Sequence, residues 1–154
     1  MIETPRIIQT VAQLTAIIPV TVPRNQIRTV MGPGVSELMA MVASQGIAPA
    51  GPWFTHHLRI DPQVFEFEIS VPVTAPVPAL GRVKPGLWPA MKVVRTVYQG
   101  PYEGMGPAWG EFDAWIEAQG LKTGQDFWEV YVAGPESGSD PKLWRTEFSR
   151  RLLD

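Results

Sequence analysis

The sequence contains no cysteine and only two histidines, His56 and His57. Without cysteine the chain has no disulfides, no thiolate metal ligands and no cysteine nucleophile. The two histidines are adjacent, so on a strand they point to opposite faces and cannot both bind one metal ion. We therefore expect neither a metal site nor a cofactor.

Concentrated positive charge and long apolar runs are also missing. The 13 Lys and Arg residues are scattered, apart from Arg145–Arg151, and the formal net charge is −2. A protein that binds a phosphate backbone needs a basic patch. The apolar stretch 11–22 is interrupted by Gln13, Thr15 and Pro19, and no secretory signal precedes it. We expect no direct nucleic-acid contact, no membrane association and a cytoplasmic location.

An internal repeat is the most informative feature that the sequence does have. Residues 31–46 read MGPGVSELMAMVASQG and residues 105–120 read MGPAWGEFDAWIEAQG, and they align without a gap. The same tripeptide, Arg-Thr-Val, precedes both copies at residues 28–30 and 95–97, with seven extra residues (98–104) in the second copy. A duplication of this length predicts two similar units related by a pseudo-twofold axis, with a shared cleft.

Sixteen prolines and fourteen glycines divide the 154 residues into short elements. Apolar periodicity and these breakers predict helices at 33–46 and 107–119, and strands at 53–60, 64–73, 91–98, 127–132 and 143–152. The segment 7–22 is expected to be extended and 134–141 to be a loop. We expect one domain (1–154) of two-layer α+β class. Its first repeat covers about 1–73, its connection 74–89 and its second repeat about 90–154. Each repeat is strand-helix-strand-strand, which predicts one largely antiparallel sheet with two helices on one face.

Glu129 is the strongest candidate for a functional residue. It lies in Phe127-Trp-Glu-Val-Tyr131, where both faces of a strand would be apolar, so the carboxylate is expected to be buried. A buried carboxylate is costly unless it is protonated, paired with an arginine or reserved for a cationic ligand. An ion pair with Arg28, Arg95 or Arg145, or exposure at a sheet edge, would be the structural alternatives.

The repeat places Thr55 at the position of Glu129 and His57 at that of Tyr131, so a polar pair differs between the two halves. Glu68 and Glu147 also match one another, which favours a shared structural role. Aromatic faces beside a carboxylate can bind a flat cation. Besides Tyr131, the candidate aromatic residues are Tyr98, Tyr102, Trp53, Phe127 and Trp109.

The blocks TVPRNQIRTVMGPGVSEL, YQGPYEGMGPAWGEFDAWIEAQGL, FWEVYVAGP and WRTEF closely resemble the GyrI-like small-molecule-binding domain. This family includes effector-binding domains of AraC- and MerR-type transcription regulators. The resemblance implies a tandem fold with a central cavity that accepts bulky, often cationic aromatic compounds, as in multidrug binding, through a buried glutamate. The glutamate's position falls on Glu129. No residues remain for a helix-turn-helix segment, so we expect no DNA binding by this chain alone.

Three functions agree with these observations. The first is a stand-alone protein that captures amphipathic, cationic aromatic ligands, with Glu129 supplying the opposite charge. The second is a hydrolase of strained electrophilic natural products, with Glu129 as general base. The third is a protein-interaction module that acts on a partner such as DNA gyrase. A binding protein rather than an enzyme is our leading interpretation.

Overall fold

The computed structural model describes residues 2–59, 61–134 and 140–153. The chain forms two compact units. Unit one comprises Met1–Thr10 and Met91–Asp154, and unit two comprises Val11–Ala90. Most of the predicted loop 134–141 lies outside the described residues.

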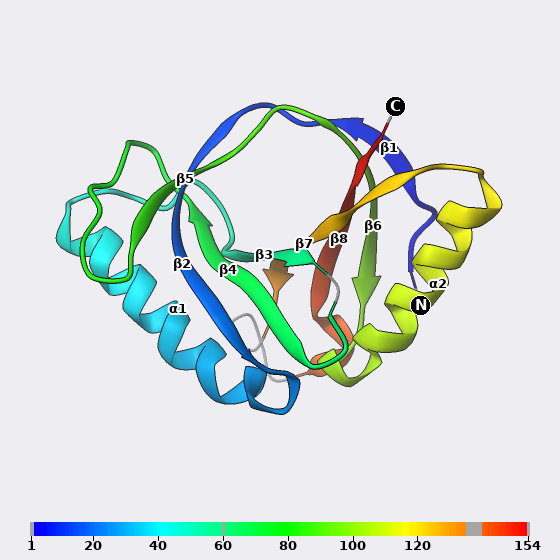
Figure 1. Ribbon diagram of the computed structural model, residues 1–154, viewed down its shortest axis with the longest axis horizontal. Helices are drawn as coiled ribbons and strands as arrows, with labels where there is room; N and C mark the ends of the chain where they lie inside the picture. The colour runs from blue at the N-terminus through cyan, green and yellow to red at the C-terminus, as the bar shows by residue number, and fades with distance from the viewer. Residues whose placement is uncertain (1, 60, 135–139, 154) are drawn as a thin grey trace. The chain divides into compact units, whose positions relative to one another are not determined.

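Unit two is a four-stranded antiparallel sheet with one helix packed on one face (Figure 1). Its strand order is β3-β4-β2-β5. Its elements in chain order are β2 (Gln13–Pro23), a 3₁₀ turn (Arg24–Gln26), α1 (Ile27–Ser44), β3 (Phe54–Arg59), β4 (Val64–Pro72) and β5 (Lys84–Trp88).

Unit one repeats this arrangement with the strand order β1-β6-β8-β7 and helix α2 packed against its sheet. Its elements are β1 (Arg6–Gln9), β6 (Lys92–Gln99), a 3₁₀ turn (Tyr102–Gly104), α2 (Met105–Ala118), β7 (Thr123–Ala133), a 3₁₀ turn (Pro141–Leu143) and β8 (Arg145–Leu152). The predicted α+β class, antiparallel pairing and duplicated strand-helix-strand-strand unit are confirmed.

The edge strands β1 and β5 are exchanged between the two units. Each is followed in the chain by elements of the unit to which it does not belong. β1 precedes β2 but pairs with β6, whereas β5 precedes β6 but pairs with β2. The segment 7–22 is therefore two strands that belong to different units, and the predicted connection 74–89 contains β5. Unit one is interrupted between Thr10 and Met91. The Thr10 backbone N–H (2.8 Å) and hydroxyl (3.1 Å) both donate to the Met91 carbonyl. These bonds hold the end of β1 in unit one.

Helix α1 begins at Ile27, so the predicted start at Pro33 is wrong. Pro33 removes one backbone hydrogen bond, but Ile27, Val30 and Met31 pack on the core and keep the preceding turns helical. The tripeptide match is also wrong as a structural equivalence, because residues 28–30 are helical and 95–97 lie in strand β6.

The helices end as the repeat predicts. Gly46 and Gly120 have φ angles of 68° and 70°, the left-handed conformation that favours glycine. After each glycine a backbone N–H bonds five residues back, from Ile47 to Val42 (3.3 Å) and from Leu121 to Ile116 (3.2 Å). Both helices therefore end in the same Schellman-type cap.

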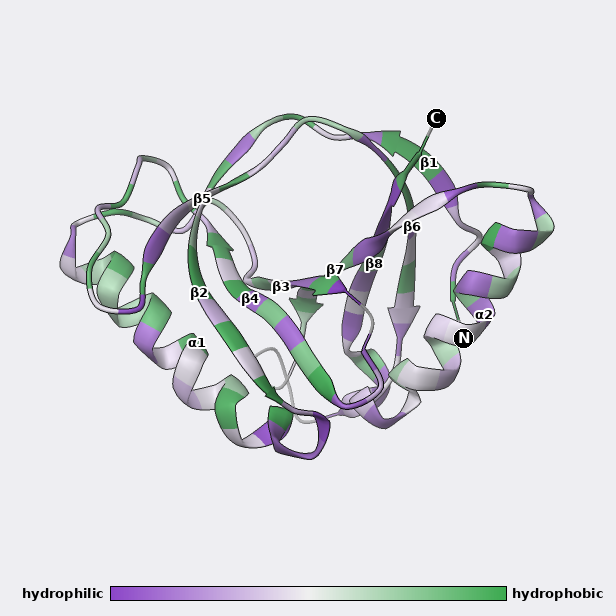
Figure 2. Ribbon diagram, in the orientation of Figure 1, coloured by the Kyte–Doolittle hydropathy of each residue, from purple (hydrophilic) through white to green (hydrophobic). Residues whose placement is uncertain are grey.

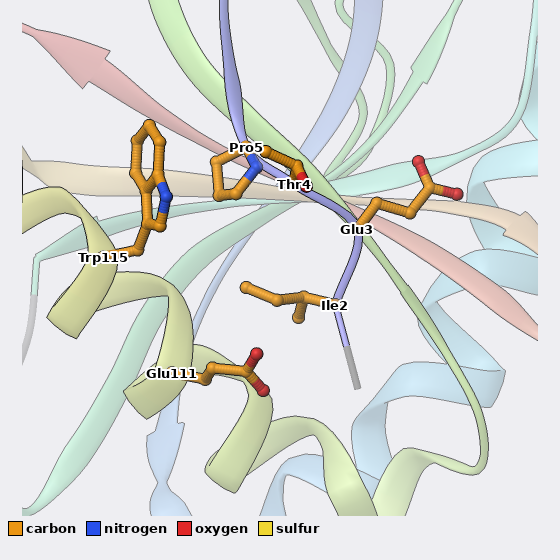
Figure 3. A pocket seen from close by; sticks show the side chains of 6 residues that line it. All are labelled: Ile2, Glu3, Thr4, Pro5, Glu111 and Trp115. Carbon is orange, nitrogen blue, oxygen red and sulfur yellow. The ribbon is translucent and has the colours of Figure 1, made fainter.

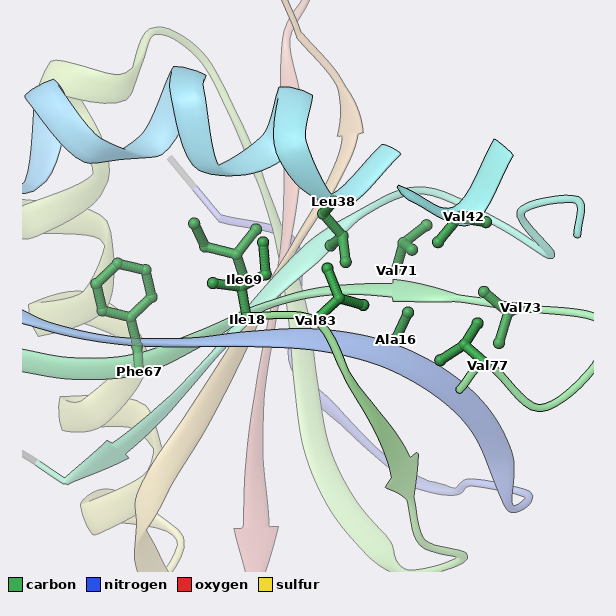
Figure 4. Packing of buried hydrophobic residues seen from close by; sticks show 10 residues of the cluster. All are labelled: Ala16, Ile18, Leu38, Val42, Phe67, Ile69, Val71, Val73, Val77 and Val83. Carbon is green, nitrogen blue, oxygen red and sulfur yellow. The ribbon is translucent and has the colours of Figure 1, made fainter. Parts of the chain in front are cut away.

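The buried helix positions also repeat. Gly34, Leu38 and Val42 are the buried residues of α1, and those of α2 are Ala108, Phe112 and Ile116, each 74 positions later. Hydrophobic and hydrophilic residues alternate along the strands (Figure 2), so each sheet turns one apolar face to its helix. In unit two this core contains Ala16, Ile18, Leu38, Val42, Phe67, Ile69, Val71, Val73, Val77 and Val83 (Figure 4).

Candidate functional site

Glu129 lies on the face of the unit-one sheet that α2 covers. Its pairing partner on β8 is Phe148, which in turn pairs with Thr96 on β6. Side chains directly opposite one another on paired strands share a face. Phe148 belongs to the core cluster that contains Phe112 of α2, so the row to which Glu129 belongs faces the helix.

Two neutral donors hold the Glu129 carboxylate. The Trp109 indole N–H on α2 donates to Oε2 at 2.6 Å, and the Tyr131 hydroxyl donates to Oε1 at 2.9 Å. Arg95 is engaged with Glu147, and Arg145 with Glu3. The geometry thus favours a carboxylate held by an indole and a phenol over the ion pair with Arg95 or Arg145.

Burial raises the pKa of Glu129 above its usual value, because desolvation disfavours the charged form. The hydrogen bonds from Trp109 and Tyr131 act in the opposite direction and lower that pKa. The residue as a whole keeps an intermediate exposure, so the carboxylate is largely surrounded by protein but not sealed off. Hydrogen-bond donors or a cation beside such a group favour its charged form.

Aromatic rings surround Trp109 beside this carboxylate. Its ring stacks on Phe148 at a centroid distance of 4.3 Å and an interplanar angle of 8°. Phe127 meets it edge-on at 4.7 Å, and Phe112 lies tilted at 5.6 Å. The predicted residues Trp109 and Phe127 are thus brought together with Glu129.

Tyr102 extends the aromatic group from the 3₁₀ turn before α2. It meets Tyr131 edge-on at 6.1 Å and lies tilted against Trp144 at 4.9 Å. Tyr98, by contrast, is only 4% exposed and donates its hydroxyl to the Pro101 carbonyl at 2.8 Å. Tyr98 therefore anchors the turn that carries Tyr102.

In unit two, Thr55 and His57 occupy the positions that match Glu129 and Tyr131. Thr55 pairs with Ile69, which pairs with Ile18, so this row corresponds to Glu129–Phe148–Thr96. Thr55 is fully buried, and Trp53, just before β3, packs against the unit-two core.

His57 is 4% exposed and stacks on Phe67 at 5.1 Å. Burial lowers its pKa to about 3, with smaller contributions from His56 and Arg24. The imidazole is therefore neutral at physiological pH. The duplicated fold thus holds a carboxylate in one unit and neutral polar groups at the matching place in the other.

Glu68 and Glu147 lie at matching positions on the opposite face of their sheets, and each contacts a basic side chain. His56 Nδ1 lies 3.3 Å from a Glu68 oxygen, and Arg95 Nε lies 3.4 Å from a Glu147 oxygen. Their shared structural role is the one that the repeat predicted.

Sequence reasoning missed Phe148 and Trp144 as neighbours of the candidate residues. Both lie in the segment Trp144-Arg-Thr-Glu-Phe148, where alternate residues share a face of β8 and its approach. That period of two was the signal that could have identified them. Within residues 2–59, 61–134 and 140–153, no group of three or more His, Cys, Asp or Glu side chains could hold a metal ion.

The chain belongs to the GyrI-like family, since the model of the GyrI-like small molecule binding domain matches residues 4–149. It is thus a small-molecule-binding domain of this class, and the resemblance stated from sequence is confirmed. No curated protein matches the sequence. None of the helices in the described part of the chain has the length and apolar character needed to cross a membrane.

Solved structures show the same fold at low sequence identity. The EcmrR C-terminal domain is 18% identical, with a TM-score of 0.86 and 98% of each chain covered. In the EcmrR–DNA complex the chain spans 57% of the EcmrR chain and 98% of its own length, at a TM-score of 0.85 and 18% identity. SAV2435 bound to tetraphenylphosphonium is 13% identical (TM-score 0.73; 98% of this chain and 94% of that one). A hydrolase from Listeria innocua is 14% identical (TM-score 0.67; 97% and 91%).

Proposed function

We propose that this protein binds bulky lipophilic cations on the α2-covered face of unit one, with Glu129 as the anionic group. The observation that carries the proposal is the Glu129 carboxylate, which accepts hydrogen bonds from Trp109 and Tyr131 beside a group of aromatic rings. Burial disfavours the charged form of a carboxylate, so a bound cation stabilises that charged form strongly.

The aromatic surroundings suit a ligand with several rings. Trp109, Phe127, Tyr102 and Tyr131 present flat faces and edges within one group of contacts. A cation over such a face gains about 0.5–2 kcal/mol when desolvated. SAV2435, which has the same fold, was solved with tetraphenylphosphonium, a cation with four phenyl rings.

Tyr98 supports the turn that carries Tyr102. Thr55, His57 and Trp53 belong to unit two and are not part of this proposed site. With a single acidic group, Glu129, among the residues proposed for this site, the ligand would carry one positive charge.

The test compares tetraphenylphosphonium with neutral triphenylphosphine oxide in isothermal titration calorimetry, using wild type and Glu129→Gln. A glutamine can accept from the Trp109 N–H through its oxygen and donate to the Tyr131 hydroxyl, so both hydrogen bonds are retained. We expect the affinity for the cation to fall about tenfold to a hundredfold, a loss of about 1.4–2.8 kcal/mol. The affinity for the oxide should change by less than about threefold.

Glu147→Gln is the matched control, because this carboxylate lies on the opposite face and pairs with Arg95. It should leave both affinities unchanged. Equal losses for cation and neutral ligand in Glu129→Gln would reject the charge role of Glu129. Failure of wild type to bind either compound would reject the proposed site.

Hydrolysis is a second candidate function, favoured by the raised pKa of Glu129. A carboxylate with a raised pKa is a stronger base, and the neighbouring Tyr131 hydroxyl could orient water or substrate. Incubation with a strained electrophilic natural product, followed by mass spectrometry, separates the two functions. Multiple turnovers that disappear in Glu129→Gln would support catalysis, whereas stoichiometric binding without product would reject it.

A further inference from the structure

A pocket lies in unit one between helix α2 and the segment before β1 (Figure 3). Its volume is about 260 Å³, and Glu111 and Trp115 project into it from α2. The opposite wall is formed by residues 2–5. None of these residues belongs to the Glu129 site, so the pocket needs its own explanation.

The duplication identifies what occupies the corresponding place in unit two. The buried residues of the two helices match at an offset of 74, so Glu111 corresponds to Glu37 and Trp115 to Met41. Glu37 binds a guanidinium with both carboxylate oxygens: Arg82 Nη2 donates to Oε1 at 2.8 Å and Nε donates to Oε2 at 3.1 Å. This pair also lowers the pKa of Glu37.

The strand registers match the opposite walls as well. Because Ile18 corresponds to Thr96, the preceding residues Ile17 and Arg95 correspond too. Ile17 pairs with Lys84 of β5, and Arg95 pairs with Arg6 of β1. Lys84 and Arg6 therefore hold the same place in the two units.

Arg82 lies two residues before Lys84 in unit two, and Thr4 lies two residues before Arg6 in unit one. Arg82 and Thr4 are therefore equivalent positions. The intervening residues Val83 and Pro5 are both buried, as expected for equivalent positions. Threonine has no guanidinium and is too short to span the distance that arginine spans. Unit one thus keeps the glutamate, lacks the arginine and has a pocket lined by Thr4 where unit two has the arginine side chain.

We propose that this pocket binds a guanidinium group from outside the chain, in the place that Arg82 takes in unit two. Among the described residues, Glu111 has no ion-pair partner, whereas Glu3 on the pocket wall is already paired with Arg145 at 2.8 Å. Glu111 is therefore the acidic group that remains for a ligand.

Size and shape favour the same ligand chemistry. A guanidinium is planar, donates two parallel hydrogen bonds to a carboxylate and stacks on aromatic faces. Trp115 supplies an aromatic face where unit two has Met41. A volume of about 260 Å³ is below the range of drug-sized sites and suits a group as small as an arginine side chain or a small arylalkylguanidinium.

The test follows the Trp115 indole N–H signal in ¹⁵N NMR spectra, assigned by its loss in Trp115→Phe. The probes are N-benzylguanidinium, the neutral isostere N-benzylurea and N-acetylarginine amide. We expect N-benzylguanidinium to shift the signal saturably at millimolar concentrations and N-benzylurea to leave it unchanged. A shift by N-acetylarginine amide as well would identify arginine side chains of peptides as ligands, and its absence would identify small arylalkylguanidiniums.

Substitutions at two exposed positions, Glu111 and Thr4, test the assignment without disturbing the core. Glu111→Gln should weaken N-benzylguanidinium binding at least fivefold, whereas the matched change Glu37→Gln should have no effect. Thr4→Arg should abolish binding by filling the pocket from within, and Thr4→Ser should retain it. The proposal is overturned if N-benzylguanidinium causes no saturable shift, if N-benzylurea binds equally well, or if Glu111→Gln or Thr4→Arg has no effect. Glu129→Gln should leave this binding intact, which separates the pocket from the proposed cation site.

Discussion

At the scale of single residues, two buried titratable groups are held in opposite ways. Burial raises the pKa of Glu129 and lowers that of His57, so both side chains are driven toward their neutral forms. Hydrogen bonds from Trp109 and Tyr131 favour the charged form of Glu129, whereas the charges of His56 and Arg24 further disfavour the charged form of His57. This difference is why we assign ligand charge recognition to Glu129 and a packing role to His57.

The depressed pKa of His57 makes a prediction about acid stability. The folded protein keeps His57 neutral down to about pH 3, while the unfolded chain binds a proton below its ordinary pKa of 6.5. The stabilisation is therefore complete above pH 6.5 and is lost as the pH falls toward 3. Between pH 7 and pH 5 this residue alone should reduce the free energy of unfolding by about 2 kcal/mol.

Urea unfolding of wild type and His57→Phe at both pH values measures this loss. Phenylalanine keeps an aromatic ring beside Phe65 and Phe67 but cannot be protonated. The variant should therefore lose about 2 kcal/mol less than wild type between pH 7 and pH 5. The same pH dependence in both proteins would mean that His57 is protonated in the folded state.

At the scale of elements, the two helices show how sequence periodicity and tertiary packing combine. The spacing of Leu38 and Val42, and of Phe112 and Ile116, indicated the buried stripes correctly. The start of α1 could not be predicted, because contacts of Ile27 and Val30 with the core extend the helix before Pro33. Such contacts outweigh the local signal of a proline.

Two glycines, Gly110 within α2 and Gly120 just after its end, should respond oppositely to alanine. Gly120 ends the helix at φ 70° with open space around it, so Gly120→Ala should cost about 1 kcal/mol through backbone strain alone. Gly110 lies within the helix, also in open space, so Gly110→Ala should stabilise by about 0.5–1 kcal/mol. Thermal or urea unfolding measures both changes, and changes of the same sign would show that the cap assignment is wrong.

At the scale of the whole molecule, the exchange of edge strands distinguishes this chain from two repeats joined end to end. β1 closes the sheet of unit one although it is followed in the chain by unit two. The residues before β1 add further contacts to unit one, including the Thr96 hydroxyl of β6, which donates to the Glu3 carbonyl at 2.6 Å. The first ten residues are thus part of the unit that contains Glu129.

Deletion of residues 1–10 should therefore destabilise unit one selectively. Loss of β1 leaves the β6 edge, which includes the buried Val94, without its pairing strand. In hydrogen-exchange measurements we expect β6 amides to lose protection by at least about tenfold, while those of β2 and β4 change little. An equal loss in β2 and β4 would contradict the division of the chain into these units.

Local patterns in the chain were sufficient for the α+β class, the duplicated unit and the glycine caps at the helix ends, and they made Glu129 the leading candidate residue. Each depends on alternation, spacing or a glycine at a fixed position, and these act over a few residues. Tertiary structure decided the exchange of β1 and β5, the Trp109 and Tyr131 bonds to Glu129, and the contrast between Arg82 and Thr4. These features join residues that are far apart in the chain or come from different elements, so only the packed strands and helices bring their side chains together.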